Sequence, residues 1–132
     1  MIAAVVTLAG CASTAPPASP VGTGWSRAPD LSVYAAMQTA GEIAREQDVL
    51  CWGRNPAAVD ANWRTRFSER EAWIAAALET RYGPAAVRAN GPLRVGRERC
   101  PPFDTGKWRR HHADLLRTLE LRLYPRDYWS AG

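Results

Sequence analysis

Hydrophobic residues recur every three or four positions along three segments of the chain, which is the spacing of an amphipathic α-helix. The first segment covers residues 31–51, and Asp30 or Ser32 is its expected N-cap. Gly41 lies in the middle of this segment and weakens the helix by about 1 kcal/mol relative to Ala. The apolar positions of the segment are Val33, Ala36, Met37, Ala40, Ile43, Ala44, Leu50 and Cys51.

The second segment covers residues 56–82 and has a proline at its first helical position, where an N–H group is not needed. A helix of this length is about 40 Å long at about 1.5 Å per residue, and Gly83 ends it. Ser68 and Glu71 match a capping box, so the pattern allows a break or kink near residue 68. One stripe consists of Val59, Trp63, Phe67, Ile74, Leu78 and Tyr82.

A third helix is predicted after Asp104 or Thr105, either of which can cap it, and Pro125 ends it. Between the second and third helices, residues 84–89 allow one helical turn, whereas residues 92–103 show no helical period. Because no segment alternates like a strand, the predicted fold class is all-α: a small three-helix bundle with a long irregular connection between the second and third helices. The inner face of the third helix consists of Trp108, His112, Leu115, Leu116, Leu119 and Leu123.

The start of the chain has a different pattern. Residues 2–9 form an uncharged apolar run, too short to span a bilayer and typical in length of a signal peptide. The run ends in Leu8-Ala9-Gly10-Cys11, which resembles the lipobox of bacterial lipoproteins. This resemblance covers only these few residues, and no basic residue precedes the run as that family's pattern requires. It implies cleavage after Gly10 and attachment of a diacylglycerol to Cys11; the alternative is a buried N-terminal helix or strand.

Residues 12–29 are rich in Ala, Ser, Thr, Pro and Gly, which is typical of a flexible tether. Random-coil scaling gives such a tether a reach of roughly 25 Å. The resemblance to lipoproteins implies the outer membrane, facing the periplasm, because Ala12 rather than Asp follows the lipidated cysteine. The predicted organisation is a signal peptide (1–10), the lipidated cysteine with its tether (11–29) and a helical domain (30–132).

With Cys11 taken by lipid, Cys51 and Cys100 remain, in a compartment where thiols oxidise. We predict a disulfide between them, which contributes about 4 kcal/mol for a loop of about 50 residues. This bond places the start of the third helix beside the end of the first, so the third helix runs antiparallel to the first and parallel to the second. The alternatives are two free buried cysteines, or a zinc site with His111 and His112, for which CxxC and HxxxH spacings are absent.

Composition and charge add a candidate contact surface. The 132 residues are 46% hydrophobic and carry a net charge of +4, values that are ordinary for one folded domain. Residues 94–110 hold six basic residues against two acidic ones, a local charge of +4. A planar guanidinium binds two oxygens of a phosphate or carboxylate at once, and the alternative is a set of solvated arginines. The residues expected to contact an anionic partner are Arg97, Arg99, Arg109 and Arg110.

The familiar catalytic and nucleotide-binding motifs are absent, and the sequence predicts no catalytic residue, metal ion or cofactor. His112 falls on the apolar stripe, as a packed histidine does, and Asp104 is better placed as a cap than as an acid. Glu42 and Glu46 share a helix face at a spacing typical of a solvated surface. Near the C-terminus, the aromatic side chains expected to fold back over the third helix are Tyr124, Tyr128 and Trp129.

The sequence therefore favours a non-enzymatic envelope lipoprotein, a small disulfide-braced helical module tethered to a membrane through Cys11. Its expected partners are lipopolysaccharide, peptidoglycan or an envelope protein, and not nucleic acid, which the periplasm largely lacks. The rival hypothesis is a small periplasmic enzyme or metal-binding protein that uses His111, His112 and Asp104. An inhibitor or accessory subunit of a periplasmic enzyme is a third hypothesis.

Overall fold

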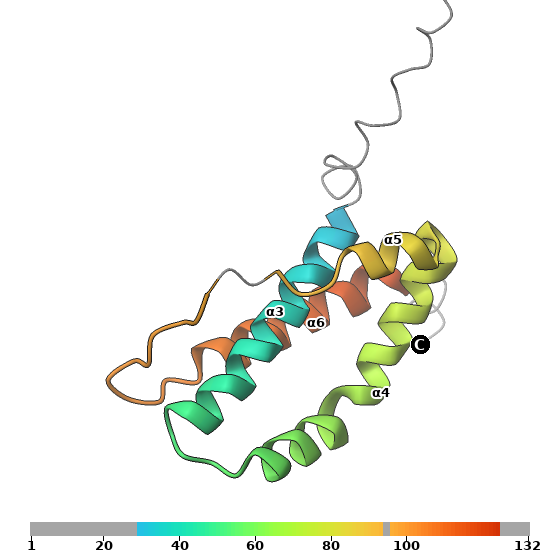
Figure 1. Cartoon of the computed structure of the whole chain (residues 1–132). Coiled ribbons are helices and arrows are strands. Elements are labelled where there is room, and N and C mark those ends of the chain that lie inside the picture. Colours follow the sequence, from blue (N-terminus) through green and yellow to red (C-terminus); the bar gives the residue numbers. More distant parts are fainter. Residues whose placement is uncertain (1–28, 94–95, 125–132) are drawn as a thin grey trace, which may run out of the picture.

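The computed structural model describes residues 29–93 and 96–124, and this part of the chain is helical with no strand (Figure 1). The all-α fold class is confirmed, and the second helix and the short turn have the predicted bounds. Predictions that fall on residues 1–28 and 125–132, including Cys11, Tyr128 and Trp129, lie outside the described residues. The helices are α3 (Pro29–Leu50), α4 (Pro56–Tyr82), α5 (Pro84–Ala89) and α6 (Lys107–Leu123).

The predicted caps of the first and third helices are wrong. Asp30 and Ser32 both lie inside α3, which starts at Pro29. The N-cap of α6 is Gly106, whose φ of 67° is a left-handed conformation that glycine adopts readily. The side chains of Asp104 and Thr105 instead accept hydrogen bonds from the backbone N–H groups two residues later, at 2.9 and 3.3 Å. They stabilise the turn that leads into α6 rather than the helix itself.

Asp30 joins the start of α3 to the ends of two other helices. Its Oδ2 accepts hydrogen bonds from the Tyr82 hydroxyl at 3.1 Å and from Arg81 Nη1 at 3.4 Å. Arg122 Nε lies 2.8 Å from Oδ1 as an ion pair, without the geometry of a hydrogen bond. The buried carboxylate therefore has two hydrogen-bond donors from α4 and the positive charge of Arg122 from α6, which offset the cost of burying it.

At the opposite end of the domain, Cys51 and Cys100 form the predicted disulfide, with Cα atoms 5.6 Å apart. Beside it, Arg109 Nη1 donates to Asp48 Oδ1 at 2.8 Å, so the start of α6 lies against the end of α3. Because Asp30 meets Arg122 at the other end, α6 runs antiparallel to α3, as predicted.

The direction of α4 follows from two aromatic contacts with α6. Phe67 lies against His112, and six residues later Trp73 stacks on Tyr124 with ring centroids 4.3 Å apart. α4 and α6 therefore run in the same direction, as predicted. Tyr124, the C-cap of α6, therefore packs its ring on α4.

The core lies where the three long helices face one another. The predicted stripes of α4 and α6 are buried, with Tyr82, Trp108 and Leu115 only half-buried. Leu50 is 53% exposed although it was expected on the apolar face, because it is the last residue of α3, well beyond Ala44, the last residue of the helix that is buried. The buried cluster comprises Leu31, Met37, Ala44, Trp63, Phe67, Ile74, Leu78, Val87, Leu116, Leu119 and Leu123.

The predicted capping box inside α4 does not form. Ser68 Oγ donates to the Arg64 carbonyl at 2.7 Å, and Glu71 pairs with His112. α4 is one continuous helix that changes direction along its length in Figure 1. Side-chain hydrogen bonds to the carbonyl four residues back are a common cause of such bending.

The long connection between α5 and α6 runs along α3. Gln38 Nε2 donates to the Asn90 carbonyl at 3.0 Å, and the Leu93 N–H donates to Thr39 Oγ1 at 2.8 Å. Closer to the disulfide, Gln47 Nε2 donates to the Arg99 carbonyl at 3.2 Å. None of the described helices is long and apolar enough to cross a membrane.

Replacing both Cys51 and Cys100 with serine should lower the free energy of unfolding by about 4 kcal/mol, because the unfolded chain regains the freedom of a loop of about 50 residues. Urea denaturation of the variant and of the oxidised and reduced parent protein measures this difference. Reduced parent protein should behave like the variant. Equal midpoints for oxidised and reduced protein would show that the bond contributes nothing.

Candidate functional site, a groove lined by arginine

A groove of about 850 Å³ lies between the first half of α4 and the start of α6, next to the end of α3. This volume is in the range of sites that hold a small molecule or a short piece of a polymer. We call it the arginine groove because five arginines line it, with one acidic residue, Asp48. The arginines are Arg54, Arg66, Arg70, Arg109 and Arg110, and the other residues are Asn55, Ala58, Val59, Asn62, Trp63, Phe67 and Ala113.

The three large apolar residues of the arginine groove offer little surface to a ligand. Val59, Trp63 and Phe67 are only 7–8% exposed, because their side chains pack into the core. Asn55 has its side-chain oxygen engaged by the Ala58 N–H at 3.0 Å, whereas Asn62 is exposed. The accessible lining therefore combines guanidinium and amide groups with apolar surface from exposed Ala58 and Ala113, and its polar groups suit a charged ligand.

Two of the five arginines are held by carboxylates at the disulfide end of the arginine groove. Arg109 pairs with Asp48 at 2.8 Å and with Asp104 at 2.9 Å. Arg54 pairs with the same two carboxylates, and lies 3.3 Å from Asp104. The charge of Asp48 is the main cause that raises the pKa of Arg54 above its ordinary value. Two carboxylates therefore balance two guanidinium groups.

Asp104 stays ionised in this network. Burial acts to raise its pKa, but hydrogen bonds from the Gly106 N–H and from Arg109 outweigh that effect and hold the pKa below its ordinary value of 3.8. A carboxylate with a lowered pKa stabilises the fold above pH 3.8 and loses that contribution as the pH falls through the folded-state value. At neutral pH its negative charge is fully present.

Arg70 is held by a carboxylate of α6. Its Nε and Nη2 donate to the two oxygens of Glu120, both at 2.7 Å, in a bidentate pair. Hydrogen bonding to Glu120 is the main cause that raises the pKa of Arg70. This pair uses two of the five N–H donors of Arg70 and balances its charge.

Arg66 and Arg110 differ from the other three. Among the described residues, neither forms an ion pair with a carboxylate: Arg66 lies over the ring of Phe67 at 5.1 Å, and Arg110 donates to the Thr105 carbonyl. Both residues are exposed. Five guanidinium groups face three carboxylates, Asp48, Asp104 and Glu120, so two positive charges remain in this part of the chain.

The two arginines are positioned by a buried contact between their helices. The ring of His112 is fully buried, and its centroid lies 4.5 Å from that of Trp63 and 4.6 Å from that of Phe67. His112 Nε2 lies 2.8 Å from Glu71 Oε2, a hydrogen bond that fixes the ring against α4. Arg66 directly precedes Phe67 and Arg110 precedes His112 by two residues, so this contact fixes how far apart the helix segments that carry the two arginines lie.

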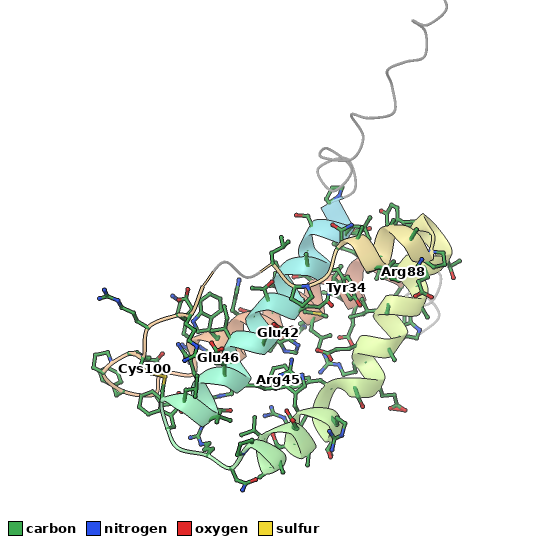
Figure 2. The ribbon with its side chains drawn as sticks, in the orientation of Figure 1. Tyr34, Glu42, Arg45, Glu46, Arg88 and Cys100 are labelled. Carbon is green, nitrogen blue, oxygen red and sulfur yellow. A yellow bond between two sulfur atoms is a disulfide. The ribbon has the colours of Figure 1, made fainter. Side chains whose placement is uncertain are left out.

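Gly41 lets α3 approach the same point. A Cβ atom at this position would lie 2.8 Å from Trp63 Cζ2 and 3.1 Å from His112 Cδ2. Arg45, one turn later, places its guanidinium 4.8 Å from the centre of the Trp63 ring, and Figure 2 shows it between α3 and α4. The glycine that weakens the isolated helix therefore permits close packing of three helices.

The structure places the four predicted contact arginines in different surroundings. Arg109 and Arg110 line the arginine groove, whereas Arg97 lines a smaller hollow of about 310 Å³ beside the disulfide. Arg99 is exposed in the connection and lines neither.

The sequence interpretation missed the arginines that α4 and the loop before it contribute. Arg66 and Arg70 follow Asn62 at four-residue intervals, which places the three on one face of α4. That polar stripe was the available signal. Arg54 precedes the helix and carried no such pattern.

The residues of the rival hypothesis are not assembled into one site. Among the described residues, no hydrogen bond or ion pair joins any two of Asp104, His111 and His112: Asp104 is held by arginines, and buried His112 bonds to Glu71. His111 is exposed, and its ring lies 5.8 Å from that of Trp108. No cluster of three or more potential metal ligands occurs in residues 29–93 and 96–124.

Comparison of the chain with protein-family models, curated proteins and solved structures finds no match in any of the three. The function is therefore inferred from the arginine groove and from the sequence.

Replacing Gly41 with alanine should lower the free energy of unfolding by about 1 to 2 kcal/mol. The new methyl group overlaps two buried rings, and overpacking of that kind outweighs the gain in helix propensity. Thermal and urea denaturation measure the effect. Gly91→Ala is the matched control, since its Cβ would have no neighbour nearer than 3.9 Å. A G41A protein as stable as the parent would contradict the close packing described here.

Proposed function

We propose that this protein is a non-enzymatic envelope lipoprotein, a small helical module anchored by Cys11 that binds anionic envelope material in the arginine groove. The observation that carries the proposal is the pair Arg66 and Arg110 on the two walls of the groove, both without a carboxylate partner in the described chain. Guanidinium groups bind the oxygens of phosphates and carboxylates in bidentate geometry, and lipopolysaccharide and peptidoglycan carry such groups.

The disulfide supports a location outside the cytosol. Disulfides persist in oxidising compartments such as the periplasm and are rare where thiols are kept reduced. The Cys51–Cys100 bond therefore agrees with the export that the Leu8–Cys11 resemblance implies. The location we propose is the outer membrane, facing the periplasm, because Ala12 rather than Asp follows the cysteine that the lipoprotein resemblance implies is lipidated.

The arginine groove lies at the end of the domain away from the proposed anchor. α3 starts at Pro29, where the proposed tether ends, and Asp48 near its other end lines the groove. A helix of 22 residues is about 33 Å long, so the groove lies about that far from Pro29, where the proposed tether joins the domain. This placement suits a module that reaches from its membrane toward material beyond it.

If Cys11 carries the lipid anchor, cells given a labelled fatty acid should incorporate the label into the parent protein. The Cys11→Ser variant should stay unlabelled, because only the Cys11 thiol accepts the lipid. Intact mass of the parent should correspond to an acylated chain that begins at residue 11. The matched control is the Cys51→Ser, Cys100→Ser variant, which should keep the label. Label retained by C11S, or an unacylated parent with residues 1–10 in place, would contradict the anchor.

If the arginine groove binds anionic envelope material, the double variant Arg66→Glu, Arg110→Glu should bind it less well than the parent. We expect retention of the full-length protein, in non-ionic detergent, on peptidoglycan sacculi or lipopolysaccharide beads to fall by about tenfold or more. The loss follows from replacing two attractive charges with two repulsive ones. Arg97→Glu with Arg99→Glu makes the same change in net charge outside the groove and should have a much smaller effect. Exposed Arg88, on α5 at the other end of the domain (Figure 2), offers a single-site control.

Far-ultraviolet circular dichroism and thermal denaturation show whether each variant is folded. If R97E/R99E abolishes retention and R66E/R110E does not, the connection and not the groove is the contact surface. If the parent protein is retained by neither material, while a pull-down from solubilised envelope recovers a protein partner that needs Arg66 and Arg110, anionic envelope material is the wrong ligand class.

A further inference from the structure

We infer that the arginine groove is selective for a phosphate monoester, held between Arg66 and Arg110. This inference rests on the proposed function and names the chemical group that the groove recognises. The two arginines lie on different helices and both line the arginine groove, and the helix segments that carry them are held together by Phe67 of α4 and His112 of α6, whose ring centroids lie 4.6 Å apart. One anion bound in the groove would be approached by a guanidinium from each of the two helices.

Charge favours a dianion. Arg54, Arg70 and Arg109 are balanced by Asp48, Asp104 and Glu120, so the arginine groove offers two positive charges and not five. A phosphate monoester carries a charge of about −1.5 to −2 near neutral pH, which matches that excess. A phosphodiester or a single carboxylate carries only one negative charge and would leave one guanidinium uncompensated.

Geometry favours one group with several acceptor oxygens. Each guanidinium presents a planar fork that donates two parallel hydrogen bonds. A carboxylate has two oxygens and satisfies one fork, whereas a phosphate monoester has three charged oxygens and can accept from two forks at once. Two carboxylates on separate carbons would need a spacing matched to the two arginines.

The surroundings favour a phosphate that carries a polar substituent. Val59, Trp63 and Phe67 are each only 7–8% exposed, so these three side chains give an acyl chain little area to bury, and the exposed apolar side chains are the small ones of Ala58 and Ala113. Asn62 is exposed on the same wall as Arg66, four residues before it, and its amide can donate to or accept from a hydroxyl group. A sugar phosphate and the headgroup of a phosphorylated lipid share this chemistry.

Isothermal titration calorimetry of the full-length protein in non-ionic detergent tests the inference. The monoester probes are glycerol 3-phosphate, glucose 6-phosphate and dihexanoyl phosphatidic acid. The comparators are succinate, glucuronate and dihexanoyl phosphatidylglycerol, which is a diester. We expect each monoester to bind with a dissociation constant at least about tenfold lower than any comparator. A stronger response to phosphatidic acid than to both soluble monoesters identifies a lipid source, and the reverse identifies a sugar or free phosphate.

Two further readouts separate recognition from general attraction. Binding of the monoesters should weaken as the pH is lowered from 7.5 to 5, because the second phosphate pKa is about 6, whereas binding of glucuronate, whose carboxylate stays ionised over this range, should change much less. Arg66→Gln with Arg110→Gln should remove the preference, the corresponding lysine pair should restore part of it, and R97E/R99E should leave it unchanged.

The inference is wrong if succinate binds as tightly as the monoesters, if the preference survives in the glutamine variant, or if no monoester binds. In any of these cases the proposed function stands when R66E/R110E still abolishes retention on sacculi or lipopolysaccharide. Both fail together when that retention is also independent of Arg66 and Arg110.

Discussion

The buried contact around His112 determines how α4 and α6 lie against each other, and the arginine groove depends on that arrangement. The imidazole is fully buried, hydrogen-bonds to Glu71 at 2.8 Å and packs against two aromatic rings of α4. Its Nδ1 has no hydrogen-bond partner among residues 29–93 and 96–124, so the bond to Glu71 is what offsets the cost of burying the polar ring. Loss of this contact would separate the two walls that carry Arg66 and Arg110.

The charged residues of the groove divide into two groups with different roles. Asp48, Asp104 and Glu120 occupy three arginines and hold the end of α3, the turn before α6 and the two long helices in register. Exposed ion pairs of this kind contribute little stability individually, but a network fixes geometry. Within the described residues, these carboxylates leave Arg66 and Arg110 unpaired and available to a ligand. The net charge of the whole chain does not show which arginines are paired and which are not.

Much of the fold could be predicted from the sequence. Hydrophobic periodicity is a local property of each helix, and the pairing of the two cysteines is a single strong constraint on how the helices are connected. The stripe from Val59 to Leu78 fixed the buried face of α4, and the Cys51–Cys100 bond gave the direction of α6. The predicted cap of α6 was wrong because the turn before that helix uses a left-handed glycine, Gly106, which side-chain propensity does not indicate. The groove was only half predicted, since Arg66 looks like any solvated helix residue until α6 is placed beside it.

The most direct test of the central claim is a titration of the full-length protein with inorganic phosphate, followed through the arginine Nε–Hε signals by nuclear magnetic resonance. Arginines already held by carboxylates should move little, so the account predicts saturable shifts at Arg66 and Arg110, with small changes at Arg54, Arg70 and Arg109. Shifts confined to Arg97 and Arg99, or spread evenly over all arginines without saturation, would contradict it.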